Sequence, residues 1–372
     1  EMARAKKEFL VVDSIFDRNL SLLNCTNGEL NLMTGELQPH DPLNYITKVL
    51  KVAYDPQATC PLWEKFLSEI MLDRPALVRY LQQIIGLCLS GDTTNHYFFV
   101  LYGQGRNGKS TLMGLLQTLL GPYAQEMPSD LLMAHKANPH GPKEAMARLA
   151  GVRLATANET DQNRRLAEST VKQFTGGDLV TARLPYARAS IEFRPECKLF
   201  LRTNHKPQID GTDEGIWNRV KLIPFEGYFP PGKANRHLPK QLEAELEGIL
   251  AWAVRGFLDY LEHGLLEPDE VKIAVQRYRD EQDSLRVFLD TEVLPRLEPG
   301  EGKRARDLHS EYLTWAELND APRLSEKALA SRLEKLGWES KRTSFGMVKY
   351  PPRKSCIADM QAGNADDRPL TA

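Results

Sequence analysis

The chain has 372 residues, of which 42% are hydrophobic and 26% are charged, and its formal net charge is -2. This length allows two or three domains, and the composition is that of a globular protein able to form sizeable cores. A nearly neutral chain is not a uniformly basic nucleic-acid coat, so DNA contacts would come from local patches. The longest strongly apolar run, Tyr97 to Tyr102, is far shorter than the roughly 20 residues of a membrane span.

The cysteines indicate a reducing compartment. Five are spread along the chain without a CxxC pair or a histidine at metal-site spacing: Cys25, Cys60, Cys88, Cys197 and Cys356. We therefore expect a cytoplasmic protein without a membrane partner, a zinc site or a disulfide framework. Because the chain starts at Glu1 rather than Met, we also expect a fragment of something longer.

The first 92 residues are predicted to form a mainly helical N-terminal domain. Apolar residues from Leu62 to Met71, and again from Leu77 to Cys88, recur at three- and four-residue spacing. Pro61 and Pro75 suit the first turns of these two helices. Before them, turn signals such as Asn27-Gly28 separate short apolar pieces.

Residues 93–232 change to short apolar strands alternating with helices. The predicted strands are Tyr97 to Tyr102, Val152 to Ala157, Lys198 to Thr203 and Val220 to Pro224. This alternation predicts the α/β class, with a mostly parallel sheet covered on both faces.

Three further segments complete the prediction. Residues 233–298 have helical periodicity and form a helical segment after the sheet domain. Residues 299–354 read as two helices followed by a hairpin, the order of a winged helix. Residues 355–372 are polar and are predicted to be disordered.

The clearest motif is a phosphate-binding loop between a strand and a helix. It fits GxxxxGK[ST], and its predicted nucleotide-binding residues are Gly103, Gly105, Arg106, Asn107, Gly108, Lys109, Ser110 and Thr111. Glycines let the backbone N–H groups face phosphates, and the helix N-terminus adds a favourable field. Lys109 would reach the β- and γ-phosphates, and the Ser110 hydroxyl would bind Mg²⁺. ATP and Mg²⁺ are therefore the expected cofactors.

Three later residues are candidates for the catalytic machinery. Glu159 ends the second predicted strand, where a carboxylate can hold Mg²⁺ and polarise water; the alternative is a solvated loop residue. Asn204 ends the third strand and either senses the γ-phosphate or caps a turn. Arg219 either reaches across a subunit interface as an arginine finger or is a surface residue. The segment after Thr203 lacks the NKxD element of GTPases, which disfavours that class.

These elements resemble the superfamily 3 helicases, in the phage and plasmid primase-helicase branch that includes the poxvirus primase-helicase. The resemblance covers nearly the whole chain and is carried by Asn27-Gly28, Leu37 to His40, Tyr54-Asp55, Cys60 to Trp63, Gly103 to Thr111, Asn158 to Thr160, Lys172, Thr175 to Asp178, Thr181 to Arg183, Thr203 to Pro207 and Trp217 to Arg219. In one departure, Asn158 stands where many such helicases have a second acidic residue, so metal contact rests on Ser110 and Glu159.

The resemblance implies a ring of AAA+-like modules, a hexamer in this family, with ATP at subunit interfaces and 3′ to 5′ travel on one DNA strand. It implies phage or plasmid replication in the bacterial host cytoplasm, and a primase or polymerase domain as a possible companion.

Two regions are candidates for DNA contact. From Arg183 to Lys206, six Lys or Arg accompany two Glu, and a hairpin with Tyr186 and Arg188 at its tip suits a single strand in a pore. Residues 323–354 hold nine Lys or Arg against three Glu, and the candidates there for duplex or forked DNA are Lys327, Arg332, Lys341 and Arg342. The alternative for both regions is an ordinary charged surface that is exposed to solvent and does not contact DNA.

The leading hypothesis is an ATP-dependent DNA helicase. A DNA-bound initiator or loader ATPase without processive unwinding is the alternative, and a small-molecule kinase is a third class. Stimulation of the ATPase by single-stranded DNA would separate a motor from a kinase.

Overall fold

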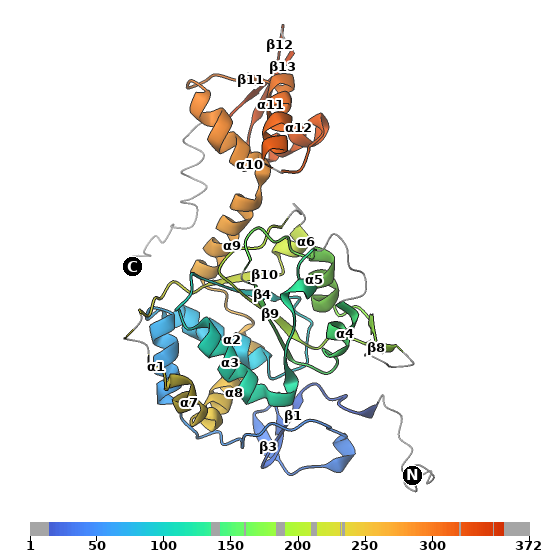
Figure 1. Ribbon diagram of the computed structural model, residues 1–372, viewed down its shortest axis with the longest axis vertical. Coiled ribbons are helices and arrows are strands. Elements are labelled where there is room, and N and C mark those ends of the chain that lie inside the picture. The colour runs from blue at the N-terminus through green and yellow to red at the C-terminus, as the bar shows by residue number, and fades with distance from the viewer. Residues whose placement is uncertain are drawn as a thin grey trace, which may run out of the picture. The chain divides into compact units, whose positions relative to one another are not determined.

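The computed structural model describes residues 15–134, 142–159, 161–183, 190–209, 214–230, 232, 235–319, 321–344 and 346–352. The chain divides into two compact units, Glu1–Arg277 and Tyr278–Ala372 (Figure 1). Within the described residues, no helix is long and apolar enough to cross a membrane. The segment 355–372, predicted to be disordered, lies outside the described residues.

The first unit opens with a small antiparallel sheet that the helical prediction for 1–92 missed. Its strands, in spatial order, are β1 (Leu22–Cys25), β2 (Gly28–Asn31) and β3 (Glu36–Gln38). The Asn27 amide holds this sheet to the following segment, because its Nδ2 donates to the Tyr54 carbonyl and its Oδ1 accepts from the Tyr54 amide, both at 2.9 Å. The strands are only three or four residues long, too short for a clear alternation in the sequence.

The two predicted helices are present and pack against helices that follow the central sheet in sequence. They are α1 (Pro61–Ile70) and α2 (Pro75–Leu87), and their later neighbours are α7 (Leu238–Glu243) and α8 (Leu246–His263). Helix α2 packs along α8, and α1 and α3 both contact α7. Residues from the predicted segments 1–92, 93–232 and 233–298 share one hydrophobic cluster, so their boundaries do not separate cores.

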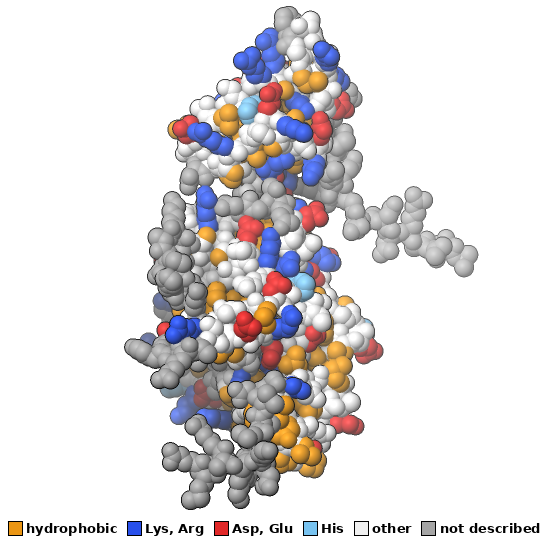
Figure 2. Space-filling view, turned by 90° about the vertical axis from the view of Figure 1, so that its right-hand side faces the viewer, with side chains coloured by type: hydrophobic (Ala, Val, Ile, Leu, Met, Phe, Trp, Pro, Cys, Tyr) orange, Lys and Arg blue, Asp and Glu red, His pale blue; other side chains and the backbone are white. Residues whose placement is uncertain are grey.

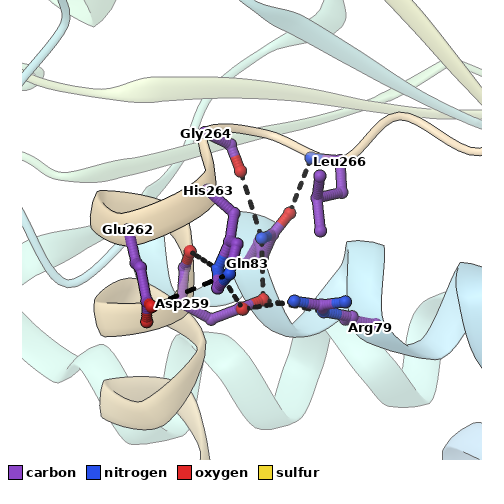
Figure 3. Close-up of polar contacts among 7 residues, drawn as sticks. All are labelled: Arg79, Gln83, Asp259, Glu262, His263, Gly264 and Leu266. Carbon is purple, nitrogen blue, oxygen red and sulfur yellow. Dashed lines mark hydrogen bonds and ion pairs between the residues drawn. The ribbon is translucent and has the colours of Figure 1, made fainter.

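A polar network closes the α2–α8 contact (Figure 3). Gln83, a fully buried side chain of α2, donates to Asp259 at 2.7 Å and to the Gly264 carbonyl at 3.1 Å, and accepts from the Leu266 amide at 2.8 Å. Arg79 forms a two-pronged pair with the same carboxylate, and this hydrogen bonding lowers the pKa of Asp259. The network joins segments about 180 residues apart in sequence.

The central sheet is parallel and five-stranded, as the α/β prediction requires. Its strands in spatial order are β10 (Val220–Pro224), β4 (Phe98–Tyr102), β9 (Lys198–Thr203), β6 (Leu154–Glu159) and β5 (Ala124–Glu126). The four predicted strands are confirmed, and the short polar strand β5 is additional. The chain leaves β4 towards β5 and leaves β9 towards β10, so β4 and β9 flank a topological switch point, where α/β proteins bind ligands.

Helices and a hairpin surround this sheet. The helices are α3 (Lys109–Leu120), α4 (Pro142–Ala147), α5 (Glu168–Thr175) and α6 (Glu214–Trp217). The predicted hairpin is confirmed as an antiparallel pair, β7 (Val180–Ala182) and β8 (Ile191–Phe193). Its tip, including Tyr186 and Arg188, lies outside the described residues.

The second unit has its own core. Helix α9 (Asp269–Gln282) crosses the division, and the elements that follow are α10 (Ser284–Phe288), β11 (Lys303–Arg304), α11 (Ala305–Leu318), α12 (Glu326–Lys335), β12 (Glu339–Thr343) and β13 (Gly346–Tyr350). Phe288 and Tyr312 meet edge to face at 5.5 Å inside this core. The two helices and the hairpin occur where the sequence predicts them, and β11 adds a third strand beside β13.

Candidate nucleotide-binding site

The glycine-rich loop forms a tight turn between β4 and α3. Gly108 has φ of 86°, a left-handed conformation that favours glycine, and a Cβ there would lie 2.5 Å from Cγ2 of Ile70. A Cβ on Gly103 would lie 2.3 Å from the Phe225 carbonyl oxygen. The loop is therefore enclosed by α1 on one side and by the segment after β10 on the other.

Two other loop residues have different roles in shaping it. Asn107 is buried, and its Nδ2 donates to the Phe225 carbonyl at 3.0 Å while its Oδ1 accepts from Lys109 at 3.1 Å. Arg106 is exposed with φ of 49°, and its carbonyl accepts from the Phe229 amide at 2.8 Å. Asn107 thus acts as a support for the loop, and Arg106 projects from it.

Lys109 is a buried cation whose hydrogen-bond partners are all neutral. Its ammonium donates to the Gly103 carbonyl, to Asn107 and, at 3.4 Å, to Oδ1 of Asn204. Among the described residues it has no carboxylate partner. Burial, followed by the charge of Arg202, lowers the pKa of Lys109 to about 8. A buried positive charge without a counter-charge is suited to receive an anion.

Glu159 lies at the same edge of the sheet. It is the register partner of Thr203, so Glu159 and Asn204 end adjacent strands side by side. The carboxylate is buried, and Oε1 accepts from the Asp161 amide at 2.9 Å while Oε2 has no hydrogen-bond partner among the described residues. An unpartnered buried carboxylate oxygen is costly unless water or a cation completes it.

The Glu159 carboxylate and the Ser110 hydroxyl are oxygen ligands of the kind that Mg²⁺ prefers. Mg²⁺ is usually bound by one or two carboxylates together with substrate phosphates, and Ser110 exposes its hydroxyl at the start of α3. Within the described part of the chain, no group of three or more His, Cys, Asp or Glu lies together as a metal site. The described cysteines, Cys25, Cys60, Cys88 and Cys197, are free and buried.

Arg219 lies at the opposite end of the sheet. It directly precedes β10, and its carbonyl accepts from the Phe98 amide, so the length of β4, roughly 16 Å, separates it from the loop of its own chain. Its guanidinium is held by the Thr175 hydroxyl at 3.1 Å, by the Gly215 carbonyl and by His96 Nδ1 at 3.3 Å. The Arg219 side chain therefore cannot reach the Lys109 site of the same chain unless the backbone moves by a large distance.

The basic candidates for DNA contact differ in their surroundings. Arg183 follows β7 and is exposed, as are Lys327, Lys341 and Arg342 in the second unit. Lys341 lies over the Tyr350 ring at 5.1 Å. Arg332 is engaged in the fold instead, because it pairs with Asp283 at 2.5 Å, and Asp283 caps α10. On the face shown in Figure 2, Lys and Arg side chains are interspersed with Asp and Glu.

The sequence missed several residues that shape the site. Thr175 and His96 hold Arg219, and Phe225 and Phe229 hold the loop through backbone groups. Thr175 belongs to a motif that carries the resemblance, but no pattern indicates that it holds Arg219, and none marks His96, Phe225 or Phe229. Each of the four acts through a contact between segments distant in the chain.

The fold and the loop define the class: a parallel α/β module of the P-loop type, with a cation, a carboxylate and an amide at one edge of its sheet. Family models place it more narrowly, since residues 2–72 match "D5 N terminal like" and residues 101–219 match "Family of unknown function (DUF5906)".

Similar proteins from large DNA viruses are named as helicases or as a primase. The chain is 29% identical over 325 residues to "Putative helicase L207/L206" of Acanthamoeba polyphaga mimivirus, covering 82% of this chain and 34% of that protein. It is 28% identical over 312 residues to "Putative helicase 022R" of Frog virus 3 (79% and 30% covered), and 27% identical over 164 residues to "Primase D5" of Fowlpox virus (43% and 20%). These matches support a D5-like primase-helicase family, and the chain spans about a third of the length of the first two relatives.

The fold is also similar to a solved structure. The apo C-terminal region of NrS-1 superimposes with a TM-score of 0.53 at 11% identity, covering 80% of this chain and 76% of that one. At this identity the likeness concerns the fold alone.

Proposed function

We propose that the chain binds ATP with Mg²⁺ and hydrolyses it as the motor of a DNA helicase. The observation that carries the proposal is the edge of the sheet where Lys109, Asn204 and Glu159 lie. Among the described residues, the buried ammonium of Lys109 has only neutral partners, and the buried carboxylate of Glu159 has one oxygen without a hydrogen bond. Lys109 would hold the β- and γ-phosphates, Ser110 and Glu159 would hold the metal, and Asn204 would contact the γ-phosphate or the attacking water.

A helicase is favoured over other P-loop activities by the relatives, several of which are named helicases. The position of Arg219 adds support. A side chain fixed at the far end of the sheet can serve catalysis only at the nucleotide of another subunit, which requires a ring or stack of subunits. We propose a superfamily 3 ring, with six subunits and 3′ to 5′ movement as in the family that the motifs resemble.

DNA would contact both units. The β7–β8 hairpin would follow the single strand, with Arg183 at its base. The second unit, which we interpret as a winged helix, would offer Lys327, Lys341 and Arg342 to the phosphates of a fork. A primase or polymerase domain elsewhere in the full-length protein, and a role in viral, phage or plasmid replication, belong to the same proposal.

Two measurements test the function. ATP hydrolysis should rise with single-stranded DNA and should vanish in Lys109→Ala; hydrolysis indifferent to DNA would favour a kinase-like enzyme. A forked duplex should then be unwound in the presence of ATP. DNA-stimulated hydrolysis without unwinding would instead support the initiator or loader alternative.

A further inference from the structure

The segment that follows β10 contacts the phosphate-binding loop at two places, Phe225 and Phe229. The Phe225 carbonyl accepts from Asn107, and four residues later the Phe229 amide donates to the Arg106 carbonyl at 2.8 Å. Consecutive Cα atoms are about 3.8 Å apart, so Tyr228 lies within one residue of a direct contact with the loop.

The turn between α1 and α2 covers the other side of the same segment. A Cβ on Gly227 would lie 3.5 Å from the Ile70 carbonyl oxygen and 3.8 Å from Cδ2 of Leu72. Arg74, at the start of α2, pairs with Glu226 at 2.7 Å. The residues flanking Tyr228 are therefore fixed on both sides, and the tyrosine is presented from a supported backbone.

Two large apolar side chains are exposed at this place. Tyr228 is 64% exposed and Leu72 is 46% exposed, although both adjoin well-packed segments. Leu72 has φ of 54° and Asp73 has φ of 55°. Two successive left-handed residues other than glycine are strained, and bulky leucine is an outlier in that region. Strain that holds an apolar side chain outward beside a binding loop is a mark of a contact surface.

We propose that Tyr228 and Leu72 form the site for the base of the nucleotide whose phosphates bind at Lys109. The inference rests on the proposed nucleotide binding and identifies the second half of that site. A nucleobase offers a flat π surface, which stacks on an aromatic ring and packs against an aliphatic side chain. The phosphate loop lies immediately beside these residues, so one nucleotide can reach both.

The test compares two ligands that differ by the nucleoside. ADP and pyrophosphate, each with Mg²⁺, are titrated calorimetrically into the wild-type chain, Tyr228→Ala and Tyr228→Phe. Tyr228→Ala should bind ADP about tenfold more weakly, in the lower range for stacking of one base, and should bind pyrophosphate as the wild type does. Tyr228→Phe keeps the ring and should keep ADP affinity.

A second variant separates base contact from folding. Leu72→Asn places a residue that tolerates left-handed backbone, so the Tm should stay the same or rise. ADP affinity should nevertheless fall severalfold relative to pyrophosphate. A Tyr228→Ala chain with unchanged ADP affinity overturns the base site, and so does an equal loss for both ligands; an unchanged ADP affinity accompanied by altered sedimentation would assign the surface to subunit contact. If Lys109→Ala binds both ligands normally, the nucleotide proposal itself fails.

Discussion

At the scale of single residues, the protonation state of Lys109 matters most. Its pKa is about 8 in the folded chain, below its ordinary value of 10.5. Between these values the unfolded chain binds more protons, so this group's contribution to the free energy of unfolding rises with pH. Burial of the charged ammonium thus lowers the free energy of unfolding by its full amount below pH 8, and this destabilisation is gone above about pH 10.5.

Nucleotide affinity should have the opposite dependence, because phosphate binding needs the ammonium form. We expect pyrophosphate affinity to fall by about thirtyfold between pH 7 and pH 9.5, since nearly all of the free lysine is neutral at the higher value. In Lys109→Arg the guanidinium stays charged, so whatever affinity remains should be flat across this range. Equal slopes for the two proteins, measured by calorimetry, would show that another group titrates.

The site was partly predictable at this scale. Strand ends of a parallel sheet meet at one edge, so the apolar runs before Gly103, Glu159 and Asn204 were enough to bring those residues together. The supports of Arg219 were not predictable, because Thr175 precedes it by 44 residues and meets it through the packing of α5. The left-handed backbone of Leu72 was not predictable either, since no residue pattern encodes a strained turn.

At the scale of elements, α2 and α8 are joined by Gln83. Gln83→Leu removes three hydrogen bonds of a fully buried side chain, whose partners are a half-buried carboxylate and two exposed backbone groups, so it should destabilise the first unit by about 1–3 kcal/mol. Chemical denaturation followed by tryptophan fluorescence would report it. Arg79→Ala breaks only an exposed pair with the same carboxylate and should change stability little. A stable Gln83→Leu chain would mean that the network adds nothing to packing.

The predictability of elements followed their length and apolar content. The four long strands of the central sheet, α1, α2 and α3 were predicted within a few residues, because each carries a full apolar pattern. The strand β5 has the sequence Ala-Gln-Glu and offers no such pattern. Its place comes from pairing with β6, a contact that only the folded chain creates.

At the scale of the whole molecule, the position of Arg219 predicts that each active site combines Lys109 of one subunit with Arg219 of its neighbour. Lys109→Ala and Arg219→Ala should each be inactive, but a mixture should recover part of the ATPase, because some interfaces then combine an intact Lys109 with an intact Arg219. Activity of the mixture is measured where chromatography shows oligomers.

A matched mixture controls this experiment. Lys109→Ala with Glu159→Gln should not recover, because both residues serve the same nucleotide and no subunit then carries the pair. Equal activity of the two mixtures would remove Arg219 from the role of a finger.

The close contact of α2 with α8 also affects how the chain is made. A Cβ on Gly86 would lie 2.4 Å from the Phe257 amide nitrogen, and one on Gly256 would lie 2.2 Å from the Gln82 carbonyl, so the two backbones nearly touch. The partner of α2 is synthesised about 170 residues after it. During translation the apolar face of α2 therefore cannot be buried against α8 until α8 has emerged from the ribosome. At about 5–20 residues per second, that interval lasts on the order of ten seconds or more, and it is the stage at which nascent chains are most exposed to aggregation or chaperone capture.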